Sequence, residues 1–299
     1  MTKHSIAKFF VLTASIIAVP ALSMAGTEMK ESKEVKSVVE TPKESWITGD
    51  IGVAVVSEYI SRGLVLENQG IIAQPYLDLY FKLYEGEGFI NKVSLNLGLW
   101  SSIHSHQQPT VGGNRSTTDA WYEFDYTAGI SVTFAKRFTG TLSYFEFDSP
   151  ADNFSTARSV NFNLAFDDTD FLGAFALHPH VAVLMELDAP GFAGLQEDGW
   201  YYEIGIAPSH TFGPVTVTIP VNVGLGNNEF YAGSNYGYTS AGIVLSTPLS
   251  FIPEKWGAWT ASAGYTYYNL GDTLQDFAAV QGDGDSTQHV FSGSIGLAF

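Results

Sequence analysis

Apolar residues alternate with small or polar residues along the last segment of the chain. From Val290 onward, one parity holds Phe291, Ile295, Leu297 and Phe299, and the other holds serine, glycine and alanine. Successive side chains of a β-strand point to opposite faces, so this segment predicts a strand with one apolar face. Similar segments recur back to about residue 50. The pattern predicts an all-β protein, a transmembrane antiparallel up-and-down β-barrel.

The lengths of the gaps between these segments give independent evidence on the number and orientation of the strands. Twelve strands can be counted, at residues 50–61, 71–84, 92–103, 120–134, 138–148, 155–167, 172–187, 199–211, 214–226, 238–250, 258–270 and 287–299. Gaps after every second strand are short, such as Ala135–Arg137, whereas most others are longer, such as Ser105–Asp119 and Gly271–Ser286. Short periplasmic turns and longer extracellular loops are typical of outer-membrane barrels. The alternation therefore predicts an even strand number and two termini on the periplasmic side.

Four prolines interrupt the pattern. Pro75, Pro179, Pro208 and Pro220 fall inside predicted strands, where each removes a backbone donor. We expect bulges or strand ends at these positions, above all in the strands predicted at 172–187 and 214–226.

The N-terminal region predicts export. Lys3 and Lys8 precede an apolar run that is too short for a membrane helix, which needs roughly 20 residues. Small residues follow at Ser23 and Ala25, as at a cleavage site. We expect residues 1–25 to be a cleaved signal peptide, 26–48 a polar periplasmic linker, and 49–299 the barrel. The location expected is the Gram-negative outer membrane.

Strand parity separates a lipid face from an inner face. In the strand at 92–103, leucines and a valine face out, while Ser94, Asn96 and Gly98 face in. In the strand at 120–134, the same parity sends Tyr122 outward. Trp100 and Trp121 have inward parity, so they are expected at the mouth of the barrel. A soluble barrel would place its apolar face inside, so the polar interior favours a membrane protein.

Composition narrows the partners. The chain has 14% aromatic residues, no cysteine and a formal net charge of −17. Removal of residues 1–25 takes away Lys3 and Lys8 and no acid, leaving a net charge near −19. Such a charge argues against nucleic acid as a partner. The expected partners are outer-membrane lipids and lipopolysaccharide, and no cofactor is expected.

Charged and titratable residues of inward parity form the candidate site. The expected pore-lining residues are Glu58, Arg62, Asp78, Lys82, Glu123, Asp125, His178, His180, Glu186 and Glu203. Their excess of acids favours cations in a narrow aqueous pore. A structural network of paired charges inside a closed barrel is the alternative.

Candidate enzymatic and metal-binding residues do not form a complete set. His104 and His106, with Ser105 between them, lie at the level where a lipid hydrolase would act, but no recognised spacing links them. His178 and His180 could share a strand face, but a metal would need a third ligand from another strand. The acidic segment Gly282–Ser286 lacks the pattern of an EF-hand. The sequence therefore assigns neither catalytic nor metal-binding residues.

One segment resembles a known family. Val56-Ser57-Glu58-Tyr59-Ile60-Ser61-Arg62-Gly63 resembles the opening strand of the TorF-type porin family, where a similar stretch enters the first loop. The resemblance implies a pore of undefined substrate, with a bend at Gly63 and with Arg62 as partner for an inner acid. A final strand ending in Phe299 also resembles the signal read by the barrel-assembly machinery.

These observations together predict a non-enzymatic, porin-like channel for passive diffusion of small hydrophilic solutes, with a preference for cations. An outer-membrane lipid-modifying hydrolase and a non-conducting adhesin or structural barrel are the alternatives. Twelve strands are close to the size at which side chains can close the interior.

Overall fold

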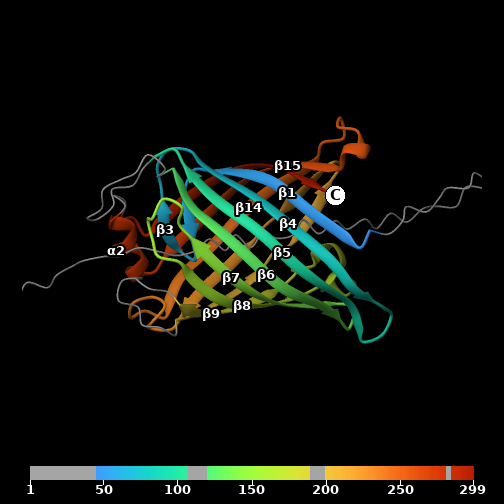
Figure 1. Cartoon of the computed structure of the whole chain (residues 1–299), viewed down its shortest axis with the longest axis horizontal. Helices are drawn as coiled ribbons and strands as arrows, with labels where there is room; N and C mark the ends of the chain where they lie inside the picture. The colour runs from blue at the N-terminus through green and yellow to red at the C-terminus, as the bar shows by residue number, and fades with distance from the viewer. Residues whose placement is uncertain (1–44, 107–119, 189–198, 281–283) are drawn as a thin grey trace, which may run out of the picture.

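The chain forms a closed antiparallel β-barrel (Figure 1), as predicted. The computed structural model describes residues 45–106, 120–188, 199–280 and 284–299. The wall strands are β1 (Ile47–Val56), β4 (Ile72–Glu85), β5 (Ile90–His104), β6 (Trp121–Phe134), β7 (Phe138–Asp148), β8 (Ala157–Phe166), β9 (His180–Asp188), β10 (Trp200–Ile206), β11 (Ser209–Phe212), β12 (Val215–Thr218), β13 (Val221–Gly226), β14 (Tyr236–Pro248), β15 (Ala258–Leu270) and β16 (Thr287–Ala298).

In the described part of the chain, fourteen strand segments form twelve wall strands, because a proline divides each of two wall strands into two segments. Pro208 separates β10 from β11, and Pro220 separates β12 from β13, while the Ile219 N–H still donates to the Pro208 carbonyl at 2.9 Å. The two prolines therefore interrupt neighbouring strands at the same level. Each proline lacks a backbone donor but keeps its carbonyl as an acceptor, and that carbonyl maintains the pairing.

Pairing of β1 with β16 closes the ring. Their register runs from Asp50 opposite Ala298 to Val56 opposite Ser292, and the Gly49 N–H donates to the Phe299 carbonyl at 2.9 Å. Both ends of the barrel sequence therefore lie at one end of the cylinder, termed the terminal end (Figure 1). The opposite end is termed the distal end. The predicted signal peptide and most of the predicted linker, residues 1–44, lie outside the described residues.

The strand predicted at 172–187 starts later than expected. The short helix α1 (Thr169–Leu172) ends at the first residue of that range, and the 3-10 turn η1 (Gly173–Phe175) follows. β9 begins only at His180, after Pro179. The pairing of Phe166 N–H with the Pro179 carbonyl at 3.0 Å marks the start of the ladder. Pro179 is thus at a strand entrance, where a missing donor is tolerated.

The outer wall is apolar. Strand residues with large exposed apolar side chains include Ile51, Val55, Leu97, Leu99, Ile130, Leu142, Phe162, Ile204, Ile243, Leu245, Phe291 and Ile295. These residues alternate with small, polar or buried residues, as in strands that face lipid on one side. None of the helices in the described ranges is long and apolar enough to cross a membrane.

A bulge overturns two predictions near the distal end. The register of β5 with β6 shifts between Ser102 and Ile103, which pair with Glu123 and Trp121 respectively. The extra residue, Tyr122, is 5% exposed and stacks on the His104 ring at 4.5 Å, whereas Trp121 is 44% exposed. A bulge breaks the two-residue period, so Tyr122 points inward and Trp121 outward.

A second, smaller sheet fills the distal half of the barrel. The chain leaves the wall at Val56, and β2 (Tyr59–Ser61) pairs with β3 (Leu64–Glu67) in a sheet separate from the wall. Residues 59–67 are termed the inner hairpin. Arg62 (φ 48°) and Gly63 (φ 84°) form its two-residue turn, and positive φ at both positions is the requirement of a type I′ turn. The prediction of a continuous strand at 50–61 was therefore wrong beyond Val56.

Helix α2 (Asp272–Val280) covers the inner hairpin at the distal end (Figure 1). Leu274 and Ala278, one helical turn apart, are fully buried, while Asp272 and Asp276 are exposed. The helix therefore places its small apolar face on β3 and its acidic face outward.

Gly63, in the turn of the inner hairpin, leaves no room for a side chain. A Cβ added there would lie 2.5 Å from Leu274 Cδ1 and 2.8 Å from Tyr238 Cδ1, in addition to the left-handed backbone. We expect Gly63→Ala to lower barrel stability by about 2–4 kcal/mol, from crowding and strain together. Gly213→Ala is the matched control, because Gly213 has φ +60° but nothing within 4 Å of the added Cβ. Thermal unfolding followed by heat-modifiable gel migration measures both, and equal losses would rule out the packing argument.

Candidate functional site

The inner wall near the terminal end is lined by hydroxyl and amide side chains. Asn96 donates to Ser131 Oγ at 2.6 Å, Ser131 Oγ lies 2.8 Å from Thr141 Oγ1, and Ser262 Oγ lies 2.6 Å from Ser294 Oγ. All of these side chains are partly buried, so solvent reaches them. A cavity of about 240 Å³, lined by Thr48, Tyr80, Lys82 and Lys92 among others, lies at the terminal mouth.

The distal half is occupied by the inner hairpin, and Arg62 at its turn contacts several wall strands. The Arg62 side chain is buried between two rings, with Cζ 5.9 Å from the centre of Phe147 and 5.6 Å from that of Tyr201. Its charge lies close enough to the carboxylates of Asp125 and Glu186 to interact with both. A buried guanidinium is stabilised by such acids and aromatic faces.

Two tyrosine hydroxyls complete the attachment of the hairpin. Tyr59, 1% exposed, donates from its hydroxyl to Glu123 Oε2 at 2.8 Å, and Tyr231 donates to the Arg62 carbonyl at 2.8 Å. The hairpin is therefore held by side-chain contacts to β6, β7 and β10 and to the segment after β13. Its two strands make no ladder with the wall.

A second inner cluster surrounds Glu203. The Tyr201 and Tyr238 hydroxyls donate to Glu203 Oε2 at 2.7 and 2.6 Å, and His180 Nε2 lies 3.6 Å from Oε1. Glu58, in the segment between β1 and β2, shares with Glu203 an electrostatic contact to Tyr268. Glu203 is thus surrounded by hydrogen-bond donors, which balance its buried charge.

A third group lies nearer the terminal end. Asp50 and Asp78 are directly opposite each other on β1 and β4, and Tyr80 makes a side-chain hydrogen bond with Asp50. Lys82 lies at the mouth, where its Nζ is 2.7 Å from Glu85 Oε2 and 5.7 Å from the Trp46 ring. Of these three groups, the pair of aspartates lies closest to the hydroxyl and amide side chains of the terminal half.

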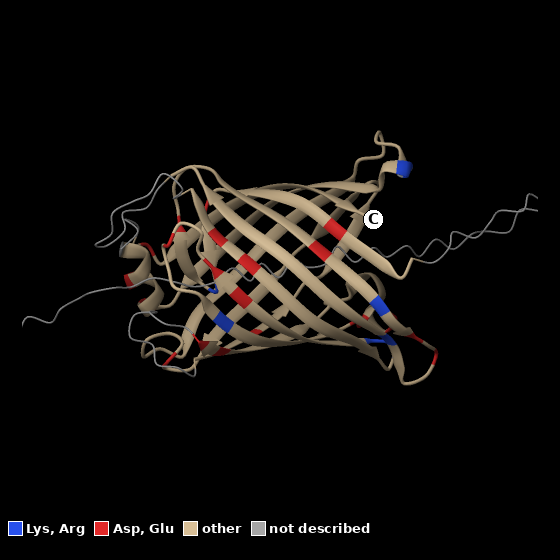
Figure 2. Ribbon diagram, viewed as in Figure 1, with Lys and Arg blue, Asp and Glu red and all other residues tan. Residues whose placement is uncertain are grey.

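Acidic residues are concentrated toward the end of the barrel that carries α2, and Lys and Arg are few there (Figure 2). The predicted residues thus divide among the Arg62 network, the Glu203 cluster and the terminal half. His178 is the exception, because it precedes β9 and lies in the turn between β8 and β9.

A serine, a histidine and a glutamate come together beneath the distal rim. Ser102 Oγ lies 2.8 Å from His104 Nε2, and His104 Nδ1 lies 3.9 Å from Glu67 Oε2, which is also 3.5 Å from His106 Nδ1. The order resembles a catalytic triad. All three of Ser102, His104 and Glu67 are at most 2% exposed, so no substrate reaches the hydroxyl in this arrangement. Ser105 instead accepts the Ile71 N–H at 2.7 Å.

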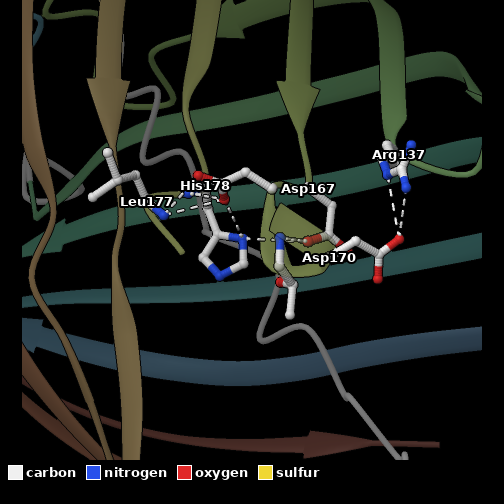
Figure 3. A network of polar contacts seen from close by, with 7 residues as sticks. Arg137, Asp167, Asp170, Leu177 and His178 are labelled. Carbon is white, nitrogen blue, oxygen red and sulfur yellow. Dashed lines mark hydrogen bonds and ion pairs between the residues drawn. The ribbon is translucent and has the colours of Figure 1, made fainter. Parts of the chain in front are cut away.

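Among the described residues, one group of side chains in the β8–β9 turn has the spacing needed to hold a metal ion. Asp167, Asp168 and His178 bring one ligand atom each within 4.8 Å of the others, and His178 Nδ1 lies 3.9 Å from an oxygen of each aspartate. His178 points toward Asp167 in Figure 3, while Arg137 contacts Asp170. The Asp168 carboxylate already accepts the backbone N–H groups of Leu177 and His178 at 2.9–3.1 Å. Those bonds account for the turn without an ion. His178 is therefore a residue of the turn, and its predicted position within a strand was wrong.

Several residues of the interior were missed by the sequence reasoning. Asp50 has inward parity on β1 and could have been found by extending the alternation used for other strands. Glu67, Tyr201, Tyr231 and Tyr238 were not identified, because their contacts with Glu203, with the inner hairpin or with the distal histidines join segments that lie far apart in the chain. The hairpin had one available signal, the glycine at position 63, because glycine is common in two-residue turns.

The fold and its surface define the class of this protein. A closed barrel of antiparallel strands has an apolar outer face, polar and charged side chains on part of its inner wall, and both ends of the barrel sequence at one end. This is the architecture of an integral outer-membrane β-barrel.

Comparisons with known proteins add no narrower identity. No family model and no curated protein matches the chain. Among solved structures, it is similar to a NanC porin (11% identity, 83% of this chain and 98% of that chain, TM-score 0.43). It is also similar to the translocator domain of the autotransporter NalP from Neisseria meningitidis (15%, 86% and 89%, TM-score 0.43). A third is a Pseudomonas aeruginosa FadL homologue (9%, 84% and 90%, TM-score 0.38). These similarities are too distant to bear on function.

The turn that contains Asp168 predicts an acid-sensitive contribution to stability. Burial of the side chain opposes its ionisation, but the N–H groups of Leu177 and His178 outweigh this and lower the pKa of Asp168 below its ordinary value. The ionised form is thus favoured in the folded state. The stability it contributes is fully present above the ordinary carboxyl pKa, about 3.9, and is lost as the pH falls through the lower folded value.

We expect Asp168→Asn to reduce the fall in melting temperature between about pH 7 and about pH 3. The same comparison with Asp170→Asn controls for removal of one acid from the turn, since Asp170 is exposed and bonded to Arg137 at 3.0 Å. An unchanged acid sensitivity in Asp168→Asn would show that its backbone contacts do not stabilise the turn.

Proposed function

We propose that this protein is an outer-membrane channel for small hydrophilic solutes, with a preference for cations, and that the inner hairpin is its gate. The observation that carries this proposal is the separation of the hairpin from the wall ladder. β2 and β3 pair only with each other, so the hairpin can leave the interior without breaking a wall strand. The distal end is taken as the extracellular side, because short turns and both barrel termini lie at the other end.

The proposed path begins in the hydroxyl-lined terminal half and meets the hairpin at mid-barrel. Water-exposed hydroxyl and amide groups replace part of the hydration of a passing solute. Beyond them the hairpin is attached by the polar contacts of Tyr59 and Arg62 and by the buried apolar side chains of Leu64, Val65 and Leu66. The polar contacts exchange with water at low net cost, whereas burial of the apolar side chains favours the closed state. A gate attached in this way is closed at rest and opens rarely.

Cation preference follows from the acids that would face the open path. Release of the hairpin removes Arg62 from Asp125 and Glu186, and Asp50 and Asp78 already face the terminal half. The exposed excess of carboxylates raises the local concentration of cations.

Loss of the Arg62 contacts is expected to open the gate. Arg62→Ala leaves Asp125 and Glu186 without the cation that neutralises them in the closed state, so the hairpin is destabilised there. In planar bilayers we expect rare openings for the wild type and frequent openings for Arg62→Ala. A variant with residues 60–66 replaced by a short Gly-Ser linker should conduct continuously.

Arg158→Ala is the matched control, since Arg158 lies on the outer wall, bonded to Glu146 at 2.9 Å and Asp188 at 3.0 Å. A folded, heat-modifiable linker variant that stays silent would contradict the proposed channel. The adhesin or structural-barrel alternative would then remain.

Selectivity is tested in the linker variant, where the hairpin no longer contributes charge. Asp50→Asn with Asp78→Asn should shift the reversal potential under a KCl gradient toward that of an unselective pore, because both removed charges face the path. Glu146→Gln with Asp188→Asn removes two acids from the outer wall and is the control. An unchanged reversal potential in the Asp50/Asp78 variant would eliminate these two aspartates as selectivity residues.

A further inference from the structure

One cavity lies on the outer face of the barrel wall. It has a volume of about 650 Å³ and lies between β6 and the segment that joins β7 to β8. Its floor consists of three side chains on the outer face of β6, and its rim comes from residues 148–156. A volume of this size is typical of small-molecule sites. None of the contacts that hold the inner hairpin uses this cavity.

Three aromatic rings form the floor. Trp121 and Phe124 meet at 5.5 Å with an angle of 74°, and Phe124 and Tyr126 meet at 4.8 Å with an angle of 82°. Each pair is therefore edge to face, so neighbouring rings present faces in nearly perpendicular directions. Trp121 and Tyr126 are each 44% exposed, so ring surface is available to a ligand. The bulge at Tyr122 creates this floor, because it turns Trp121 outward.

The rim adds negative charge without a compensating cation. Asp148 and Asp152 line the cavity, and no Lys or Arg is among its described lining residues. Asp148 accepts a hydrogen bond from Thr156 Oγ1 at 2.6 Å, which fixes the carboxylate at the rim. The Arg158 guanidinium is bonded to Glu146 and Asp188 on the outer wall. Anionic ligands are therefore repelled.

We propose that this cavity is a binding site for an alkylammonium group, with trimethylammonium as the best-fitting head. Aromatic faces attract a weakly hydrated cation through their quadrupoles, and nearby carboxylates reinforce that attraction. The combination of aromatic walls and acids is the chemistry that recognises quaternary ammonium groups. The cavity lies on the outer wall at the distal rim, so the cation can come from a free solute or from a lipid headgroup.

Choline is the probe for the site, and the full mature chain refolded in dodecyl maltoside is the material. This detergent is chosen because its headgroup carries no ammonium. Isothermal titration should show choline binding, and 3,3-dimethylbutan-1-ol, the neutral isostere of choline, should bind about tenfold more weakly or not at all. Equal binding of the two would overturn the proposal, because it would mean that shape alone is recognised.

Variants place the binding in this cavity. Trp121→Leu removes the largest ring face, and Asp152→Asn removes an exposed rim charge without disturbing packing; each should weaken choline binding about tenfold. Asp188→Asn, on the outer wall but not in the cavity lining, is the control. Choline binding unchanged by both Trp121→Leu and Asp152→Asn in folded protein would assign the binding to another surface.

The source of the cation is separated in nanodiscs. If a phosphatidylcholine headgroup reaches the cavity, choline should bind more weakly in phosphatidylcholine discs than in phosphatidylglycerol discs. If choline binds equally in both, the site takes its ligand from solution. The proposal is independent of channel activity. A linker variant that stays silent, in a protein that binds choline, would contradict the gate and leave this site standing.

Discussion

Every backbone donor and acceptor that crosses a bilayer has to find its partner within the protein, and the pairing of β1 with β16 satisfies that requirement here. Without this pairing, two long strands would expose free edges to hydrocarbon. Seven registered residue pairs, extended by Gly49 with Phe299, join the two ends of the barrel sequence. The outer apolar face, the enclosed polar interior and the position of the inner hairpin all depend on this closure.

The interior combines two different kinds of stabilisation. Wall strands are joined by backbone hydrogen bonds, which are insensitive to side-chain identity. The position of the inner hairpin depends on side-chain contacts of Tyr59, Arg62 and Tyr231, and a single substitution removes each of them. The wall consequently tolerates substitutions, whereas the distal half requires specific residues that lie far apart in the chain.

Strand positions could be predicted from the sequence because the two-residue period is a local property. The strands at 138–148 and 258–270 have the predicted bounds, and Pro208 and Pro220 fall at real interruptions. The inner hairpin could not be predicted, because Tyr59–Ser61 continues the alternation of β1 and only its contacts with β6, β7 and β10 show that it has left the wall. Tyr122 was placed on the wrong face for a related reason, since a bulge depends on both strands of a pair. His178 was predicted within a strand but lies in the β8–β9 turn, because Pro179 delays the start of β9.

The attachment of the inner hairpin has a consequence for the order of folding. The hairpin follows the first wall strand, yet Arg62 contacts Tyr231, 169 residues further along the chain, and Gly63 packs against Leu274 on α2. Contacts of such large sequence separation form slowly, because a long loop has to close first. The hairpin can therefore reach its final position only once the late wall segments that carry its contacts are in place. Closure of the distal half depends on completion of the barrel, although the closing segment is encoded near its start.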